Sequence, residues 1–104
     1  MPKIEDLFMT LSPGAQALVE VGHRADHLVA IIRGSQIASA DTPVKIFSSL
    51  RTTMAAHSKQ CQDMGVNNIT FDSEDATINF HVGRGIFALT TFDIRAIHDA
   101  QISD

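Results

Sequence analysis

The stretch from Asp41 to Gly65, "DTPVKIFSSLRTTMAAHSKQCQDMG", constrains the fold most, because both its ends and its pattern indicate a helix. Asp41 or Thr42 is a suitable N-cap, Pro43 fits the first turn, and Gly65 fits the position just past the end. Side chains recurring every three or four residues fall on one face: Phe47, Leu50, Met54, His57, Cys61 and Met64. We therefore predict one long amphipathic helix over residues 43–64, about six turns at 3.6 residues each.

The sequence after this helix alternates with a period of two, which is typical of strands with one buried face. Ile69 and Phe71 share a face in "NITFD", and "ATINFHV" and "IFALTTF" alternate in the same way. The segments "SED" and "GRG" between them suit short hairpin loops. We predict a meander of three antiparallel strands, followed by a short terminal helix capped by Asp93.

The N-terminal third predicts one or two short helices and then a β-hairpin. "KIEDLFMTL" has apolar residues at helical spacing, and Ser12-Pro13 is a good start for a second helix ending near Gly22. A strand over residues 17–21 is the alternative for that segment. In "HLVAIIRGSQIASAD" a continuous apolar run over 28–32 favours a buried strand, Gly34-Ser35 favours a turn, and residues 37–40 favour a second, shorter strand.

These segments predict an α+β fold in two layers, with a five-stranded antiparallel sheet, one long helix and short terminal helices. The expected order is one or two helices, two strands, a long helix, three strands and a short helix. A length of 104 residues fits a single domain over residues 1–104. Hydrophobic residues make up 44% and charged residues 19%, which are values of a globular protein.

The charge and the cysteine content exclude several classes of protein. A net charge of −4 lacks the basic footprint of a nucleic-acid binder and disfavours an anionic membrane surface. No apolar run approaches the roughly 20 residues that span a bilayer, and "MPKIEDLFMT" lacks a signal pattern. A single cysteine, Cys61, fits a reducing compartment. We expect a cytoplasmic protein with neither nucleic-acid binding nor membrane insertion.

Histidine and cysteine pairs are the main candidates for chemistry, and we interpret them as structural. His23 and His27 are four residues apart, as are His57 and Cys61, a spacing that suits two metal ligands on one helix face. His57 and Cys61 lie in the apolar stripe, where buried histidine and free cysteine are common, and no third ligand is evident. A metal site or a cysteine nucleophile here is a minor alternative. We predict no catalytic residue, no cofactor and no metal, and therefore no enzyme.

The expected order of elements, with two short stretches, resembles the roadblock (dynein light-chain) family. "GSQIASAD" is similar to the family's Gly-x-x-Ile-Ala-Ser segment that leads into the long helix, and "INFHVGRGIFALTTFD" is similar to its last hairpin. The chain departs from the family at Arg33, where an acidic residue often precedes the turn glycine. The resemblance spans nearly the whole chain, and no catalytic signature defines the family.

The resemblance implies a non-catalytic homodimeric adaptor or regulatory scaffold, with docking of a small Ras-like GTPase as a further implied role. Family members pair through long helices and edge strands. The strand with Ile69 and Phe71 is expected at the sheet edge, with no proline or lysine to block pairing with a second copy. Small residues on the long helix favour close helix–helix approach, although a solvated face explains them nearly as well. The predicted interface residues are Ser49, Thr52, Thr53, Ala56, Gln60, Ile69 and Phe71.

A second function class stays open from the sequence, a small-molecule sensor of the PAS or profilin-like kind. Such domains also combine an antiparallel sheet with helices, and a fold alone does not assign a function. This alternative requires a ligand cavity between the sheet and the long helix. Its lining would come from Met54, Met64, Phe80 and Phe87.

Overall fold

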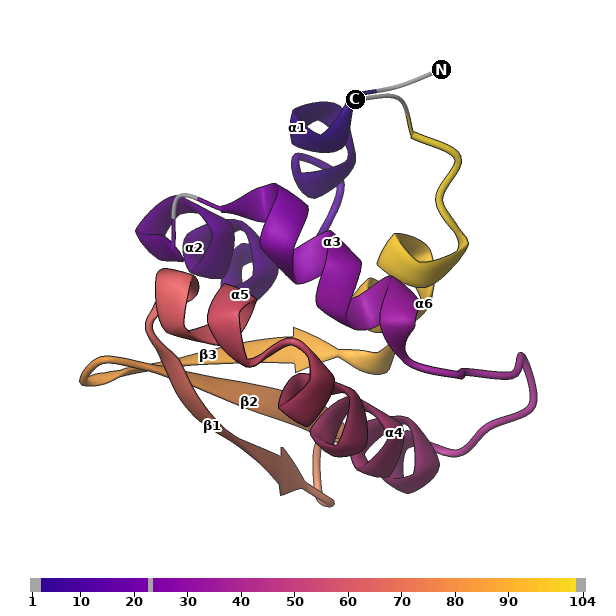
Figure 1. Ribbon diagram of the computed structural model, residues 1–104. Helices are drawn as coiled ribbons and strands as arrows, with labels where there is room; N and C mark the ends of the chain where they lie inside the picture. Colours follow the sequence, from indigo (N-terminus) through magenta and orange to yellow (C-terminus); the bar gives the residue numbers. More distant parts are fainter. Residues whose placement is uncertain (1–2, 23, 103–104) are drawn as a thin grey trace.

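The computed structural model describes residues 3–22 and 24–102 of the chain. Six helices lie on one side of a sheet in the described part (Figure 1), and four of them make the main contacts with its strands in this α+β fold. In chain order the elements are α1 (Ile4–Phe8), α2 (Pro13–Gly22), α3 (Ala25–Gly34), α4 (Pro43–Ala56), α5 (Ser58–Met64), β1 (Val66–Asp72), β2 (Thr77–Val82), β3 (Gly85–Thr90) and α6 (Thr91–Asp99). The two N-terminal helices predicted from the sequence are confirmed.

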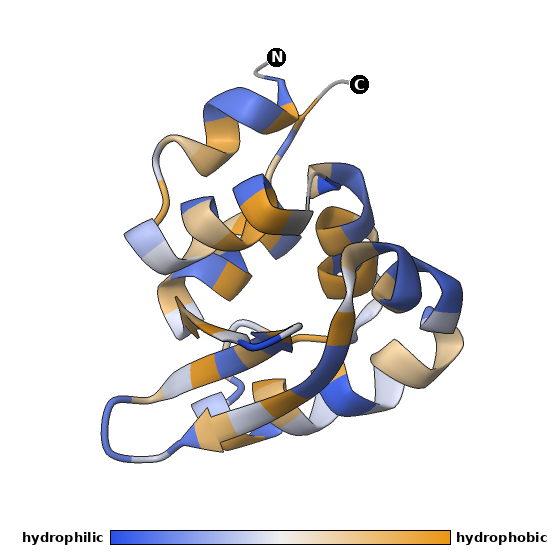
Figure 2. Cartoon of the chain, turned by 90° about the vertical axis from the view of Figure 1, so that its left-hand side faces the viewer, coloured by the Kyte–Doolittle hydropathy of each residue, from blue (hydrophilic) through white to orange (hydrophobic). Residues whose placement is uncertain are grey.

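The sheet has three antiparallel strands in the order β1-β2-β3. The predicted C-terminal meander is therefore confirmed, whereas the five-stranded sheet is wrong. Phe80 in β2 lies opposite Ile69 in β1 and Phe87 in β3, and this row faces the helices. A shift in register between Val66 and Asn68 marks a bulge at the start of β1. Figure 2 shows the hydrophobic and hydrophilic residues alternating along the strands, as the period of two predicts.

The missing strands are explained by α3, because the predicted hairpin over residues 28–40 is wrong. Its first half is helical, and four side chains are buried while Ala30 and Arg33 are exposed. A short apolar run does not distinguish a strand covered on both faces from a helix inside a core. The spacing of Ala25, Leu28 and Ile32 also suits one face of a helix, but the prediction considered only a strand for this run. The buried side chains of α3 are Leu28, Val29, Ile31 and Ile32.

The second half of the predicted hairpin is a loop that side chains hold in place. Arg95 from α6 donates hydrogen bonds to the carbonyl oxygens of Ser39, at 2.5 Å, and Asp41. The Asp41 carboxylate accepts a hydrogen bond from the amide of Ala38 at 2.8 Å. These contacts satisfy backbone groups that a neighbouring strand would otherwise pair. The loop is therefore stable without pairing to a strand of the sheet.

The prediction of a single long helix over residues 43–64 is also wrong, because the helix is interrupted at His57, between α4 and α5. His57 has φ −116° and ψ 37°, and its amide is shared between the carbonyls of Thr53 and Met54. The break turns α5 toward α3 and β1, so that Cys61 and Met64 are buried against them. Burial of these two side chains offsets the helical hydrogen bonds lost at the break. The predicted end at Gly65 is confirmed, with φ +74° in the left-handed region.

One hydrophobic core fills the space between the sheet and the helices. It includes Leu18 and Leu28 from the helices and Phe80 from the central strand, each 0% exposed. Met64 and Phe80 belong to this core, and Met54 and Phe87 pack against it. The four side chains expected to line a ligand cavity in the sensor alternative therefore pack in the core or against it.

A buried carboxylate, Asp93, joins the starts of α2 and α6. It accepts hydrogen bonds from the Ser12 amide at 3.0 Å, the Ser12 hydroxyl at 2.6 Å and the Thr90 amide at 2.9 Å. Thr90, and not Asp93 as predicted, is the N-cap of α6; Asp93 completes a capping box from the third position. Both helix N-termini thus direct their positive ends at one negative charge.

Candidate functional site

The two borders of the sheet differ, and this difference makes β1 a candidate interaction surface. The border at β3 is occupied by α2, which approaches so closely that a Cβ on Gly14 would lie 2.0 Å from the Ala88 carbonyl oxygen. At the other border, β1 contacts β2 on one side and α4 and α5 over its inner face. Within the described ranges, no element lies along the remaining side of β1 (Figure 1). Unpaired backbone groups along such a border are a template for another strand.

The sequence placed Ile69 and Phe71 at this border, and the structure turns both side chains toward the helices. Ile69 is 4% exposed. Phe71 is half-buried and stacks on Phe47 of α4, with ring centroids 5.6 Å apart. These two residues therefore contribute backbone, but not side chains, to the open border. Thr70 points to the outer face instead, where its hydroxyl lies 2.9 Å from Nε2 of His81.

The outer face of the sheet gives a direct comparison between the two borders. Asn79 of the central strand lies opposite Thr70 in β1 and Ala88 in β3, so the three residues form one row. Thr70 and Ala88 are both exposed. They occupy equivalent places on the open and the occupied border.

A cleft between α3 and α4 is lined by most of the small residues that were predicted as the interface on the long helix. The α3–α4 cleft has a volume of about 510 Å³ and brings together four of the predicted residues with parts of α3 and the following loop. Gln60 lies on α5 and is not among its lining residues. The lining consists of Gly34, Gln36, Ser49, Thr52, Thr53, Ala56 and His57.

The hydroxyl groups of the α3–α4 cleft are committed to the backbone. Ser49 accepts a hydrogen bond from the Gln36 amide at 3.1 Å, and Thr53 donates to the Ser49 carbonyl at 2.9 Å. Thr52 donates to the Ser48 carbonyl at 3.1 Å. His57 is the one titratable side chain among the lining residues and has no second acid or base beside it there, so the cleft suits close packing better than acid–base chemistry. Phe47 and Ala56 lie on opposite sides of α4 at 100° per residue, which separates the cleft from the β1 border.

His57 and Cys61, the pair weighed as metal ligands, do not share one helix. His57 lies at the break and Cys61 lies within α5. No group of three histidine, cysteine, aspartate or glutamate side chains suited to a metal ion occurs among residues 3–22 and 24–102. His23 of the other pair lies outside the described residues. The two remaining histidines of these pairs, His27 and His57, each have a buried Nδ1 without a hydrogen-bond partner among the described residues.

Cys61 is expected to react slowly with thiol reagents, because burial both shields its sulfur and raises the pKa of the thiol. A raised pKa lowers the fraction of thiolate at pH 8, which is the reactive form. We expect modification by Ellman's reagent to be at least about tenfold slower than for an exposed cysteine. The comparison is Ser58→Cys in a Cys61→Ser background, since Ser58 is exposed on the same helix. Equal rates for the two proteins would contradict the buried placement.

A charged cluster that the sequence did not predict surrounds His27 on α3. Nε2 of His27 lies 3.1 Å from the Arg24 guanidinium and 3.7 Å from the Asp63 carboxylate of α5. Asp26 lies 3.6 Å from Arg24. Desolvation alone would raise the pKa of Asp26, but the neighbouring His27 and Arg24, together with hydrogen bonds from backbone amides, outweigh it and hold that pKa below its usual value. The cluster ties α3 to α5 at the surface.

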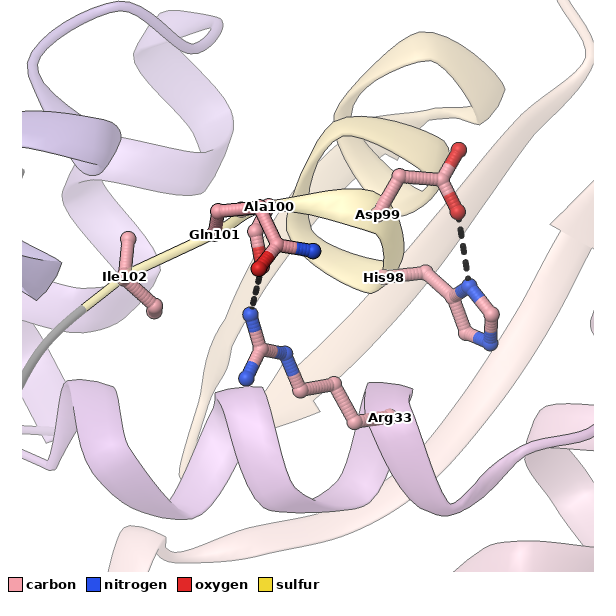
Figure 3. A pocket seen from close by; sticks show the side chains of 6 residues that line it. All are labelled: Arg33, His98, Asp99, Ala100, Gln101 and Ile102. Carbon is pink, nitrogen blue, oxygen red and sulfur yellow. Dashed lines mark hydrogen bonds and ion pairs between the residues drawn. The ribbon is translucent and has the colours of Figure 1, made fainter. Parts of the chain in front are cut away.

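Arg33, the residue that departs from the roadblock pattern, holds the C-terminal segment against α3 (Figure 3). Its guanidinium donates hydrogen bonds to the carbonyl oxygens of Ala100 and, at 3.5 Å, of Ile97. A cation at this place complements the C-terminal end of α6. The adjoining hollow of about 480 Å³ is also lined by His98 and Asp99, whose side chains pair at 3.0 Å. Because the charged groups are already paired, this hollow is a poor anion site.

Comparison of the chain with protein-family models, with curated proteins and with solved structures gave no match. The roadblock resemblance therefore stays a prediction, and the docking of a Ras-like GTPase depends on it. Within the described ranges, none of the helices combines the length and the apolar character that crossing a bilayer requires.

Proposed function

We propose that the chain is a non-catalytic adaptor that forms a homodimer through β1. The open border at β1, beside an occupied border at β3, is the observation that carries this proposal. Antiparallel pairing of β1 with a second copy extends the sheet and satisfies the outward N–H and C=O groups of both strands. The contact is symmetric, since each copy offers the same strand. The single cysteine further supports a cytoplasmic setting.

The composition of β1 is compatible with pairing to itself. Asp72 is its one charged residue, and antiparallel pairing places the two copies of Asp72 at opposite ends of the contact. No proline or lysine interrupts the strand. The bulge between Val66 and Asn68 restricts regular pairing to the second part of the strand. A short contact of this kind favours a dimer with a micromolar dissociation constant, by comparison with other small interfaces.

Sedimentation of the purified protein tests this proposal, with a dimer expected at tens of micromolar. Thr70→Lys places a charge at the open border and is expected to raise the dimer dissociation constant by at least about tenfold. Ala88→Lys makes the equivalent change at the occupied border and is expected to leave that constant within about twofold. Circular dichroism confirms that both variants remain folded. A monomeric unmodified protein, or equal effects of the two lysines, would reject pairing through β1.

A further inference from the structure

An apolar groove with an acidic rim runs between α1, α2 and α3, away from both the β1 border and the α3–α4 cleft. Two adjoining hollows of about 250 and 350 Å³ share Glu5, Val19 and Ala25 in their walls. We call them together the acidic-rimmed groove. Its apolar wall consists of Ile4, Phe8, Met9, Val19 and Ala25, and its acidic residues are Glu5, Glu20 and Asp26.

Among residues 3–22 and 24–102, apolar surface beside the groove stays exposed and is not part of the core. Met9 is 74% exposed although it directly follows α1, whereas the neighbouring Phe8 is 4% exposed. Val19 and Ala25 are half-buried and pack against the edge of the core. A large exposed side chain beside such a hollow is typical of a surface that binds an apolar group. The hollows are of a size for one or two apolar side chains.

The charges around the groove restrict the chemistry of the partner. The residues lining it include three acids and no lysine or arginine. Arg24 pairs with Asp26 at 3.6 Å and offsets one of these charges. Among residues 3–22 and 24–102, neither Glu5 nor Glu20 forms an ion pair with a basic side chain. Glu5 also complements the start of α1, so Glu20 is the acid with the least structural role. An anionic lipid surface or a nucleic acid would be repelled here.

We propose that the acidic-rimmed groove docks an amphipathic helical segment of a partner protein, with apolar side chains flanked by lysine or arginine. The apolar side chains fill the hollows beside Met9 and Val19, and the basic residues face Glu5 and Glu20. An apolar wall with charges along its edge matches the mode in which a groove receives the apolar face of a helix. The helices α1 and α2, which line most of the groove, lie across the core from the second part of β1 (Figure 1), where regular pairing is proposed, so both copies in a dimer would keep the groove accessible.

Two synthetic peptides test the groove with the unmodified protein. The basic probe is a helix-forming peptide with leucines at i, i+3, i+4 and i+7 and lysine or arginine beside them; the acidic probe replaces every basic residue with glutamate. We expect the basic probe to bind at least about tenfold more tightly and to shift the NMR amide signals of Met9, Val19 and Ala25. Equal affinities, or shifts that map to the α3–α4 cleft or to β1, would overturn the proposal.

Charge reversal at the rim provides the matched variant. Glu5→Lys with Glu20→Lys is expected to weaken the basic probe by about tenfold, because two attractions become repulsions. Glu74→Lys with Asp75→Lys makes the same change in net charge at the exposed turn after β1 and is expected to alter affinity less than about twofold. Similar weakening in both variants would assign the binding to overall charge and reject the groove. Dimerisation is measured separately by sedimentation, so a result that rejects one of the two proposals leaves the other standing.

Discussion

Replacement of Asp93 with alanine is expected to lower the free energy of unfolding by about 3–5 kcal/mol, from the loss of charge-assisted hydrogen bonds and a cap. The side chain is 1% exposed and accepts hydrogen bonds from two backbone amides and one hydroxyl. Alanine leaves the part-buried amides of Ser12 and Thr90 without this acceptor, and it removes the negative charge between two helix N-termini. This loss is a large fraction of the roughly 5–15 kcal/mol by which a typical domain is stable.

Urea unfolding followed by circular dichroism measures this loss. Asp99→Ala is the control, because Asp99 is exposed and pairs only with His98 in the described part of the chain; its expected effect is below about 0.5 kcal/mol. Asp93→Asn keeps the shape but points an N–H₂ group at one of the donors, so its expected stability lies between the alanine variant and the unmodified protein. A difference of under about 1 kcal/mol between Asp93→Ala and Asp99→Ala would contradict the central role of this carboxylate.

Local patterns were sufficient for the elements whose signals lie close together in the sequence. The alternation over residues 66–90 predicted three strands, because each strand buries one face and leaves the other in contact with water. Ser12-Pro13 and Gly65 predicted helix ends through the backbone conformations that they favour. These features depend on neighbouring residues and on little else.

The errors arose where distant contacts decide the structure. The run over residues 28–32 suits a strand or a helix, and packing against α4, α5 and α6 selects the helix. The break at His57 depends on burying Cys61 and Met64 beneath α3, which no pattern within residues 43–64 reveals. Asp93 and Ser12 are 81 residues apart in sequence, so the carboxylate was assigned to its own helix alone.

Of the candidate surfaces, the α3–α4 cleft was predicted in part and the acidic-rimmed groove was not predicted. Ser49, Thr52, Thr53 and Ala56 line one cleft, because helical spacing places them on one side of α4; their role in an interface stays a prediction. The residue that completes their cleft from α3, Gly34, was interpreted as a hairpin turn. The acidic-rimmed groove was missed entirely, since its walls come from three helices and its signal is spread over residues 4–26.

Replacement of Gly14 with alanine is expected to destabilise the protein by about 2–4 kcal/mol, the cost of forcing extra volume into a packed contact. In an exposed helix the same change would stabilise by up to about 1 kcal/mol, so the sign itself is the test. The new Cβ would lie 2.0 Å from the oxygen and 3.0 Å from the carbon of the Ala88 carbonyl. These are backbone atoms of β3, which no side-chain rotation can move aside. The helix must therefore shift away from the strand.

Gly34→Ala is the comparison that isolates this effect, and urea unfolding measures both variants. Its Cβ would lie 2.8 Å from Nε2 of His57 and 3.2 Å from Cγ2 of Thr53, which are side-chain atoms that can yield. We expect a loss at least about 1 kcal/mol smaller than for Gly14→Ala; equal losses would contradict the argument. A shift of α2 also has a consequence for assembly, because it uncovers the border at β3. With strands open on both sides of the sheet, Gly14→Ala is expected to form species larger than the dimer.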